Sequence, residues 1–500
     1  MIAPARLVSY RILLQIATSD AHSDELLRSA EVDALSAQDR NLTTTLVLGT
    51  LRWQLALDAR IRGLLARPGA KLSAEAATAL RMGAYQLGYL ERVPAHAVIH
   101  DSVELVKTAP ARKRTGGSET AMVSRARGGD PGAAGMVNAV LRKIAAQGKV
   151  ENAGPSTPRL RRSAQDDTLV MRELAARWAH PEWMVERWAR RYGLEAAEAI
   201  CRWDQEPAGI CLRLVEPGAD LEGIETEPGA FLRAARRLIR GDVGRSAAFR
   251  DGRVRIQDEA SQLVAEVLAG RAGPSRTGGE KNRTAAPNEA GQETRGGALR
   301  VLDTCAAPGG KTAILAERLP EAETTAVDIS RKRLDIMRER MPGSIAERVR
   351  FEVADAVRLQ LKPEWDLILC DVPCSGTGTM ARNPEIRLRV SEVDLRRQQA
   401  RQVAILRAGL AGLAPGGRLV YSTCSLELEE NEQVVEEVLR EASGFGVVPV
   451  EGILDRLAES GVVTADGRER LRTATEGGFL RTLPGVHPCD GFFAAILARD

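Results

Sequence analysis

Two cysteines, Cys374 and Cys424, lie in segments whose composition is typical of a site for covalent chemistry. Cys374 lies in Asp-Val-Pro-Cys-Ser-Gly-Thr-Gly at residues 371–378, and Cys424 lies in Tyr-Ser-Thr-Cys-Ser at residues 421–425. Each segment follows an apolar run that predicts a buried strand, and open α/β sheets bind ligands at the carboxyl ends of their strands. A thiolate is strongly nucleophilic, so the pair indicates chemistry at a soft electrophilic centre. Free cysteines are more often simply buried, but the Pro-Cys-Ser-Gly and Thr-Cys-Ser contexts and the acid at Asp371 favour the chemical interpretation.

A glycine-bearing turn earlier in the chain predicts a nucleotide-type binding element. Residues 299–303 form an expected strand, followed by Thr-Cys-Ala-Ala-Pro-Gly-Gly-Lys and a helix. Gly309 and Gly310 let a ligand approach the backbone N–H groups at the start of that helix. The spacing matches neither dinucleotide enzymes nor a Walker loop. The next two expected strands end at Asp328 and Asp355, suited to ribose hydroxyls and an adenine amino group. One such acid is usually a helix N-cap, but together the turn and both acids indicate a site for S-adenosylmethionine.

The N-terminal part, up to about residue 144, has the apolar spacing of a compact helical domain. Ser36 and Ser73 are expected N-caps. His96 and His100, four residues apart, could suggest a metal pair, but no third ligand is in sight, so packing and hydrogen bonding are the favoured role. No metal site is expected.

The middle of the chain, residues 167–258, mixes helix with short strands. Residues 210–214 and 254–256 have strand-like alternation and predict one small sheet. Aromatic side chains near arginines could stack on bases, although a helix face that forms the core of a small domain is favoured. These aromatics are Trp178, Trp183 and Trp188.

Composition excludes several classes of protein. The chain has 500 residues, 44% of them hydrophobic, and a net charge of only +3, so any basic surface must be local. Its seven cysteines lack C-x-x-C spacing, which argues against a disulfide scaffold or a zinc site. No signal-peptide core and no membrane-spanning run is found, so a cytoplasmic setting is expected. Polar, glycine-rich or basic composition predicts flexible insertions at about residues 110–135, 148–164 and 270–297.

Taken together, the segments resemble the RsmB/Sun family of bacterial 16S rRNA cytosine-C5 methyltransferases. The resemblance is carried by residues 303–312, 371–378, 421–425 and the following Glu-Glu-Asn-Glu, and by Asp-Gly-Phe-Phe at residues 490–493. It covers essentially the whole chain outside the insertions. The helical N-terminal part, including Tyr-Gln-Leu at residues 85–87, resembles the NusB-like RNA-binding domain of that family.

The resemblance implies a multidomain architecture. We expect an all-α NusB-like domain at residues 1–146, a small α+β RNA-substrate domain at residues 165–258, and an α/β Rossmann-like class I methyltransferase domain at residues 259–500. It also implies a monomer that binds 16S rRNA at a single-stranded or looped-out cytosine, because C6 is not accessible in a stacked base.

The resemblance further implies a role for each site residue. Cys424 forms the covalent bond to C6, Cys374 assists breakdown of the adduct, and Asp371 hydrogen-bonds the edge of the base. Cys305 is expected to pack under the cofactor turn. A segment at residues 382–385 either positions the base or a phosphate, or is a structural turn. The residues expected to hold S-adenosylmethionine are Cys305, Ala306, Ala307, Pro308, Gly309, Gly310, Lys311, Asp328, Asp355 and Asp371.

Two alternatives remain open. The same chemistry could act on tRNA, because the motifs do not determine which folded RNA is bound. The chain could also be a non-catalytic NusB-like RNA-binding or antitermination factor, although the intact cysteines, glycines and acids argue against this. A DNA cytosine methyltransferase is disfavoured, because those enzymes do not need Cys424.

Overall fold

A computed structural model describes residues 2–67, 69–108, 131–150, 164–216, 218–219, 221–270 and 298–499. The chain divides into two compact units. The first, here called the helical unit, comprises Met1–Ala208 and Met380–Arg389, and the second, the sheet unit, comprises Gly209–Thr379 and Val390–Asp500. The domain boundaries expected from the sequence remain predictions.

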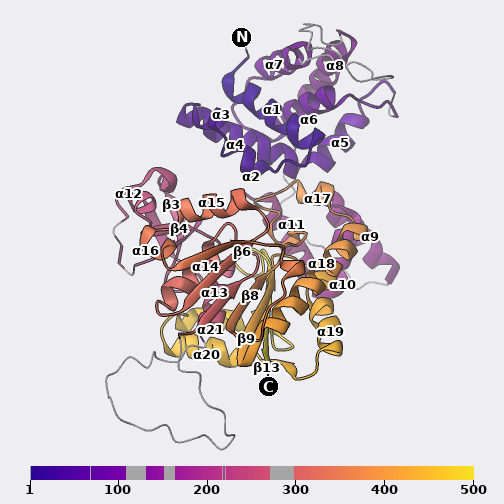
Figure 1. Cartoon of the computed structure of the whole chain (residues 1–500). Helices are drawn as coiled ribbons and strands as arrows, with labels where there is room; N and C mark the ends of the chain where they lie inside the picture. The colour runs from indigo at the N-terminus through magenta and orange to yellow at the C-terminus, as the bar shows by residue number, and fades with distance from the viewer. Residues whose placement is uncertain are drawn as a thin grey trace, which may run out of the picture. The chain divides into compact units, whose positions relative to one another are not determined.

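In the helical unit, the helices between Pro4 and Gln147 share one apolar core. Leu46, Leu80 and Leu141 are fully buried in it. The expected N-caps are confirmed, because Ser36 Oγ accepts the Asp39 amide at 3.1 Å and Ser73 Oγ accepts the Ala76 amide at 3.2 Å. The helices, seen at the indigo-to-magenta end of the colour scale in Figure 1, are α1 (Pro4–Thr18), α2 (Ser23–Leu26), α3 (Ala30–Asp33), α4 (Ala37–Arg52), α5 (Gln54–Arg62), α6 (Ala74–Tyr89), α7 (Ala95–Thr108) and α8 (Pro131–Gln147).

The helical unit also contains four further helices. They are α9 (Ala164–Arg177), α10 (Glu182–Tyr192), α11 (Leu194–Gln205) and, from the separate segment, α17 (Ile386–Arg389). Trp188 on α10 is fully buried, as expected for a helix face that forms a core, while Trp178 and Trp183 are half-buried.

The sheet unit begins with a small sheet. Within the described residues it has four antiparallel strands in the order β2 (Glu225–Pro228), β3 (Ala235–Arg240), β1 (Cys211–Leu214) and β4 (Val254–Ile256). Leu212 lies opposite Ile256, which confirms that the two strand-like segments predicted from the sequence share one sheet. A short helix, α12 (Ala247–Arg250), packs its Ala248 against this sheet.

The large sheet has nine strands within the described residues, and its main order is β11-β12-β13-β9-β8-β5-β6-β7. The run from β9 to β7 is parallel, while β13 joins β9 antiparallel. The strands are β5 (Arg300–Asp303), β6 (Glu323–Asp328), β7 (Val349–Val353), β8 (Trp365–Asp371), β9 (Leu413–Thr423), β10 (Phe445–Val447), β11 (Thr475–Glu476), β12 (Phe479–Thr482) and β13 (Phe492–Arg499).

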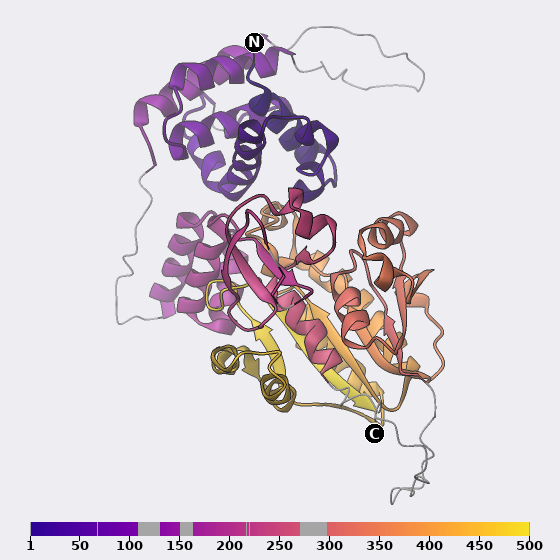
Figure 2. The same cartoon turned by 90° about the vertical axis from the view of Figure 1, so that its left-hand side faces the viewer.

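Alternate residues of the large sheet enter two different cores, because neighbouring side chains of a strand point to opposite faces. Val420 packs in one core with α13 and α20, whereas Tyr421 packs in the other with α18 and α19. Helices therefore cover both faces of the sheet, as Figures 1 and 2 show. The helices of this unit are α13 (Glu259–Ala269), α14 (Gly310–Arg318), α15 (Arg331–Arg340), α16 (Gly343–Ala346), α18 (Glu392–Gly412), α19 (Glu432–Glu441), α20 (Glu451–Glu459) and α21 (Ala465–Arg470).

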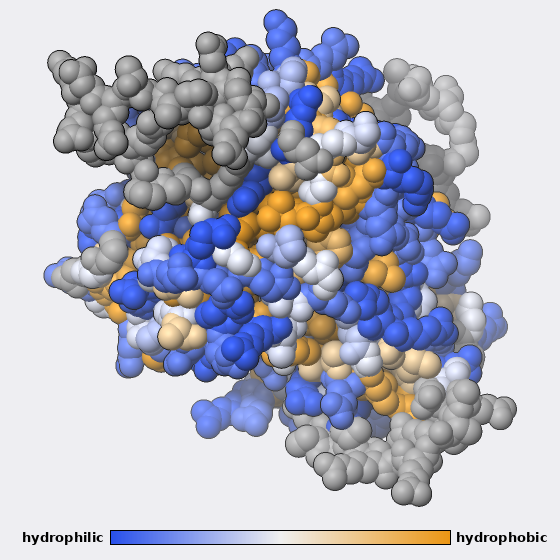
Figure 3. All heavy atoms as spheres, turned by 90° about the horizontal axis from the view of Figure 1, so that it is seen from below, coloured by the Kyte–Doolittle hydropathy of each residue, from blue (hydrophilic) through white to orange (hydrophobic). Residues whose placement is uncertain are grey.

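The expected fold class is confirmed: a helical N-terminal part, a small α+β part and a Rossmann-like α/β part. Among the described residues, no helix has the length and apolar character needed to cross a bilayer. The face in Figure 3 has hydrophilic residues interspersed with hydrophobic ones. Most of the expected insertions lie outside the described residues, although α8 already begins at Pro131.

Candidate active site

Cys374 and Cys424 lie together at the carboxyl edge of the large sheet. β8 and β9 are adjacent and parallel, with Asp371 opposite Ser422. Cys424 directly follows the end of β9 and Cys374 comes three residues after the end of β8, so the two loops leave the sheet side by side. The two Sγ atoms are 3.3 Å apart and both cysteines are half-buried. The two thiols therefore lie next to each other at this edge of the sheet.

The two thiols differ in their electrostatic surroundings. The hydrogen bond with Cys424, followed by burial, raises the pKa of Cys374 well above the ordinary value for a thiol. A thiol with a raised pKa is protonated at neutral pH, so Cys374 can donate its S–H to the sulfur of Cys424. Such a donor stabilises negative charge on Cys424.

A buried glutamate, Glu430, supports the two loops that carry Cys374 and Cys424 through hydrogen bonds. One of its carboxylate oxygens accepts the Ser375 amide at 2.8 Å and the Gln402 side-chain amide at 3.1 Å. The other oxygen accepts the Ser375 hydroxyl, which in turn lies 3.1 Å from the hydroxyl of Ser425. Burial raises the pKa of Glu430. Sequence reasoning included Glu430 in a motif without assigning it a function.

Main-chain hydrogen bonds pin the same loops to each other. The Gly378 amide donates to the carbonyl of Cys424 at 2.9 Å, and the Gly491 amide donates to the carbonyl of Gly378 at 2.8 Å. A Cβ on Gly378 would lie 2.4 Å from the Gly491 oxygen, so the backbones approach too closely for any side chain. The Thr377 hydroxyl also accepts the Leu426 amide at 2.9 Å. The separation of the two thiols is therefore set by the backbone.

Asp371 forms an ion pair at the same edge. The Lys311 ammonium donates to one carboxylate oxygen at 2.7 Å, and the Ser422 hydroxyl donates to the other at 2.7 Å. The ammonium also lies 4.9 Å from the ring centre of Phe492. Asp371 and Lys311 thus present a paired charge beside the thiols, and Lys311 connects the thiol site to the turn that follows β5.

Asp303, the last residue of β5, accepts hydrogen bonds from the turn and the helix that follow it. The Thr312 hydroxyl donates to Asp303 at 2.6 Å, and the Cys305 amide donates to its other oxygen at 3.4 Å. Burial raises the pKa of Asp303 to about 7. Gly309 has a φ of 101°, which favours glycine, and a Cβ there would lie 2.6 Å from Met337. Both its backbone conformation and the close approach of Met337 therefore require glycine at the start of α14.

Both acids expected for the cofactor lie at the carboxyl edge: Asp328 is the last residue of β6, and Asp355 comes two residues after the end of β7. Asp328 is buried and accepts the amides of Ser330 and Ala307 at 2.9 and 3.3 Å. Asp355 accepts the Val357 amide at 3.1 Å, so it also caps the short turn that follows. Between them Ile329 exposes 56% of its surface, although it is apolar. Sequence reasoning did not identify Ile329 as a candidate, although an apolar residue directly after a strand-end acid is a visible signal.

Two further cysteines near the site, Cys305 and Cys370, are unreactive thiols. Burial raises the pKa of Cys370 to about 12 and raises that of Cys305 well above the ordinary value. Neither is a reactive thiolate at neutral pH, which agrees with the expectation that Cys305 packs under the turn.

No group of three or more His, Cys, Asp or Glu side chains in the described part of the chain could hold a metal ion. His96 and His100 are exposed on α7, and His100 Nδ1 lies 3.2 Å from Asp101. The expected hydrogen bonding is thus found for His100, whereas the expected packing is not found, because both histidines are exposed.

The segment at residues 382–385 ends in a buried carboxyl. Glu385 is fully buried and accepts the amide and hydroxyl of Ser23 in the helical unit, at 2.8 and 2.9 Å. The sequence left open whether this segment positions the base or a phosphate, or is a structural turn. For Glu385 the structural interpretation holds, because its carboxyl is buried and hydrogen-bonded to Ser23.

Comparison with known proteins adds independent evidence. A family model described as 16S rRNA methyltransferase RsmB/F matches residues 293–498, and a NusB family model matches residues 3–116. The chain is 31% identical over 506 residues to the "Probable ribosomal RNA small subunit methyltransferase B" of Bacillus subtilis (strain 168), covering 98% of both. It is 30% identical to the ribosomal RNA small subunit methyltransferase B of Xanthomonas campestris pv. campestris, covering 99% of this chain and 97% of the relative.

A solved structure, that of PH0851, has a TM-score of 0.71 with 20% identity, and the match covers 100% of this chain and 99% of the other. At that identity the likeness shows the fold alone. The family-level resemblance found in the motifs is thus confirmed over nearly the full length, and the chain belongs to the RsmB/F family of 16S rRNA methyltransferases, with a NusB-family region at its N-terminus.

Proposed function

We propose that this protein transfers a methyl group from S-adenosylmethionine to C5 of a cytosine in 16S rRNA, through a covalent adduct between Cys424 and C6 of the base. The observation that carries the proposal is the pair of thiols 3.3 Å apart at neighbouring strand ends, beside the Asp371–Lys311 ion pair. C5 of cytosine is a weak nucleophile until a thiolate adds to C6, so a site with a nucleophilic thiol meets the chemical requirement.

In this reaction each residue of the site has a defined role. The Cys424 thiolate, supported by the S–H of Cys374, adds to C6 and makes electrons available at C5. Asp371 hydrogen-bonds the edge of the base and, with Lys311, stabilises the charge that develops during this addition. After C5 has gained the methyl group, Cys374, having released its own proton to solvent, accepts the C5 proton. The electron pair of the broken C5–H bond re-forms the C5–C6 double bond and expels the Cys424 thiolate.

The residues after β5, β6 and β7 fit the cofactor. The turn at Gly309 suits an amino acid moiety, which would bind the N–H groups at the start of α14. Asp328 suits the ribose hydroxyls, and Asp355 with the exposed Ile329 suits the adenine. When bound, S-adenosylmethionine supplies an electrophilic methyl group. Residues 305–311, Asp328, Asp355 and Asp371 are therefore the proposed cofactor contacts.

The proposed substrate follows from the family and from the chemistry. Relatives covering the full chain are described as methyltransferases of the small-subunit rRNA. A 16S rRNA substrate implies a cytoplasmic enzyme, and access to C6 implies an unstacked base.

The test is methyl transfer from labelled S-adenosylmethionine to unmodified 16S rRNA, 23S rRNA and tRNA, followed by mapping of 5-methylcytosine. We expect Cys424→Ala to abolish transfer, and Cys374→Ala to trap a denaturation-resistant protein–RNA adduct. A trapped adduct in Cys424→Ala instead would reverse the two roles. Methyl transfer to tRNA only would show that tRNA, and not 16S rRNA, is the substrate. Binding of RNA without any transfer would favour the alternative of a non-catalytic NusB-like binding factor.

A further inference from the structure

Ten residues that directly continue the Cys374 loop belong to the helical unit. The chain leaves the sheet unit after Thr379, passes through the helical unit as Met380–Arg389, and returns at Val390. This segment is well buried, since Met380 and Ala381 are at most 1% exposed. A surface loop of a catalytic domain would not have this burial, so its contacts require an explanation.

Glu385 anchors the segment to the start of α2. Its two oxygens accept the amide and the hydroxyl of Ser23 at 2.8 and 2.9 Å, and His22 lies 3.8 Å from the same carboxylate. Because this carboxyl is fully buried, the hydrogen bonds from Ser23 replace the contacts with water that it loses on folding.

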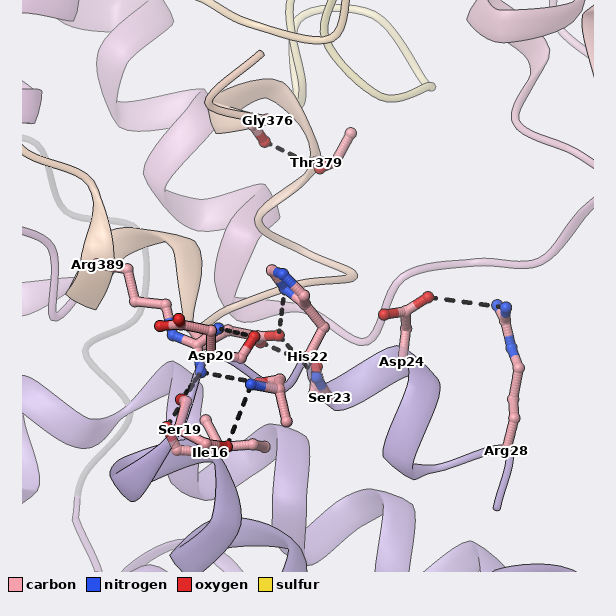
Figure 4. Close-up of polar contacts among 12 residues, drawn as sticks. Ile16, Ser19, Asp20, His22, Ser23, Asp24, Arg28, Gly376, Thr379 and Arg389 are labelled. Carbon is pink, nitrogen blue, oxygen red and sulfur yellow. Dashed lines mark hydrogen bonds and ion pairs between the residues drawn. The ribbon is translucent and has the colours of Figure 1, made fainter. Parts of the chain in front are cut away.

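Arg389 anchors the end of the segment to the last turn of α1. Its guanidinium donates to carbonyl groups of the last turn of α1 and of the residues that follow this helix, as Figure 4 shows. These acceptors are Ile16 at 3.0 Å, Ser19 at 3.3 Å, Asp20 at 3.4 Å and Ala21 at 2.8 Å.

Between these anchors, Arg387 is buried in the same unit. It donates to the carbonyl oxygens of Arg52, Ala179 and Asp204 at 3.2 to 3.4 Å. Arg52 in turn donates to the Ala381 carbonyl at 2.7 Å. The segment is thus held at its beginning, middle and end by α1, α2, α4 and α11.

Both flanks of the segment carry parts of the thiol site in the sheet unit. On the N-terminal side, Gly378 is hydrogen-bonded to the carbonyl of Cys424. On the C-terminal side, α18 begins with a Ser391 capping box, and its Gln402 donates to the carbonyl of Pro373 at 2.9 Å and to Glu430. The Cys374 loop therefore continues into the segment, and the helix that supports that loop continues from it.

We propose that Met380–Arg389 is a positioning segment, through which the helical unit holds the Cys374 loop in its productive arrangement, and that Glu385 and Arg389 are positioning residues for methyl transfer. This rests on the proposed function. It gives the helical unit a part in the chemical step, in addition to any contact with RNA. Small displacements of reacting groups are costly, because a misplacement of about 1 Å reduces rates by up to about 100-fold.

The experiment compares the full-length protein with the double variant Glu385→Gln/Arg389→Met, using methyl transfer and, independently, the rate at which iodoacetamide alkylates Cys374, read by mass spectrometry. We expect kcat to fall about 10- to 100-fold with the KM for S-adenosylmethionine within about twofold, and Cys374 alkylation to change while protein stability remains sufficient for assay. Ser23→Ala, which removes only the hydroxyl partner of Glu385, should give a smaller change in the same direction.

The matched control is Asp58→Asn. Asp58 accepts Arg81 at 2.6 and 2.8 Å between α5 and α6 of the same unit, so its loss weakens the unit without touching the segment. We expect the control to lower the melting temperature and leave kcat unchanged. An unchanged kcat in the double variant, a loss only in the KM for RNA, or equal losses of kcat in variant and control would overturn the proposal. Absence of methyl transfer in the wild type would instead overturn the proposed function, while the alkylation readout would still test the segment.

Discussion

Glu430→Gln tests whether the buried carboxyl behind the thiols influences their chemistry. Glutamine keeps the length of the side chain and one oxygen, which still accepts the Ser375 amide and the Gln402 side chain. It replaces the oxygen that accepts the Ser375 hydroxyl with an NH2 group. Because a hydroxyl can rotate and accept instead, the variant should fold with a loss of at most about 1 kcal/mol at low pH, the net value of one hydrogen bond.

The effect of pH follows from the charge that is removed. Burial raises the pKa of Glu430 above its ordinary value of about 4.3, so the folded protein binds this proton more tightly than the unfolded chain. The wild type therefore loses stability as the pH rises through the raised pKa, whereas the glutamine variant does not. The stability gap between the two proteins should narrow with rising pH.

The same charge acts on the thiol. The hydrogen bond with Cys424 and burial raise the pKa of Cys374, and the Glu430 carboxylate raises it further. Glu430→Gln should therefore lower the pKa of Cys374 and shift the pH profile of adduct release towards lower pH.

Two measurements check this reasoning. Thermal melting across a pH series reports the narrowing gap, and single-turnover decay of the protein–RNA adduct reports the pH profile of release. Glu429→Gln, the neighbouring substitution in the turn Leu428–Glu430, serves as the control and should leave the profile in place. A release profile that does not move in Glu430→Gln, or moves towards higher pH, would refute the electrostatic argument.

Two other substitutions probe the supports of the site. Gly378→Ala places a Cβ 2.4 Å from the Gly491 oxygen, so it should lower the free energy of unfolding by about 1–3 kcal/mol and reduce methyl transfer. The control is Gly452→Ala, whose Cβ meets nothing closer than 3.7 Å and which should have neither effect. Equal effects of the two substitutions would contradict the argument from close packing. Asp303→Asn should gain stability relative to the wild type as the pH rises from about 4 to about 7, because burial raises the pKa of this carboxyl to about 7 and the folded wild type holds a proton that the unfolded chain has already lost. Melting curves at about pH 4 and at pH 7 or above give the comparison, and a constant difference between the two proteins would count against this reasoning.

The strand ends were predictable because they depend on local patterns. The apolar runs before Asp371 and Cys424, and the turn at Gly309, predicted β8, β9 and the cofactor turn close to their observed positions. The division of labour between the thiols came from family resemblance and remains a proposal. The distance between the thiols was not predictable from spacing, because it depends on β8 and β9 being neighbours in the sheet, a long-range property of the fold.

The supporting residues were missed for a related physical reason. Ser375 and Glu430 are 55 residues apart, and Ser23 and Glu385 are 362 residues apart, yet each pair is joined by two hydrogen bonds. No periodicity in the sequence reports such pairs, because their partners are chosen by tertiary packing. The apolar Ile329 after Asp328 is different, since its position alone could have identified it.

The arrangement of supports argues that the backbone, more than the side-chain rotamers, determines the thiol geometry. Gly378 is hydrogen-bonded to the carbonyl of Cys424, and Val372 donates its amide to Ser422, so the loops are joined on both sides of Cys374. Removing either sulfur leaves these bonds intact. Loss of activity in a cysteine variant would then report lost chemistry, whereas loss of activity in Gly378→Ala or in the positioning segment would report lost geometry. The two classes should separate in Cys374 alkylation: Gly378→Ala changes the rate through geometry, whereas Cys424→Ser shifts its pH dependence towards lower pH, because the hydrogen bond with Cys424 raises the pKa of Cys374.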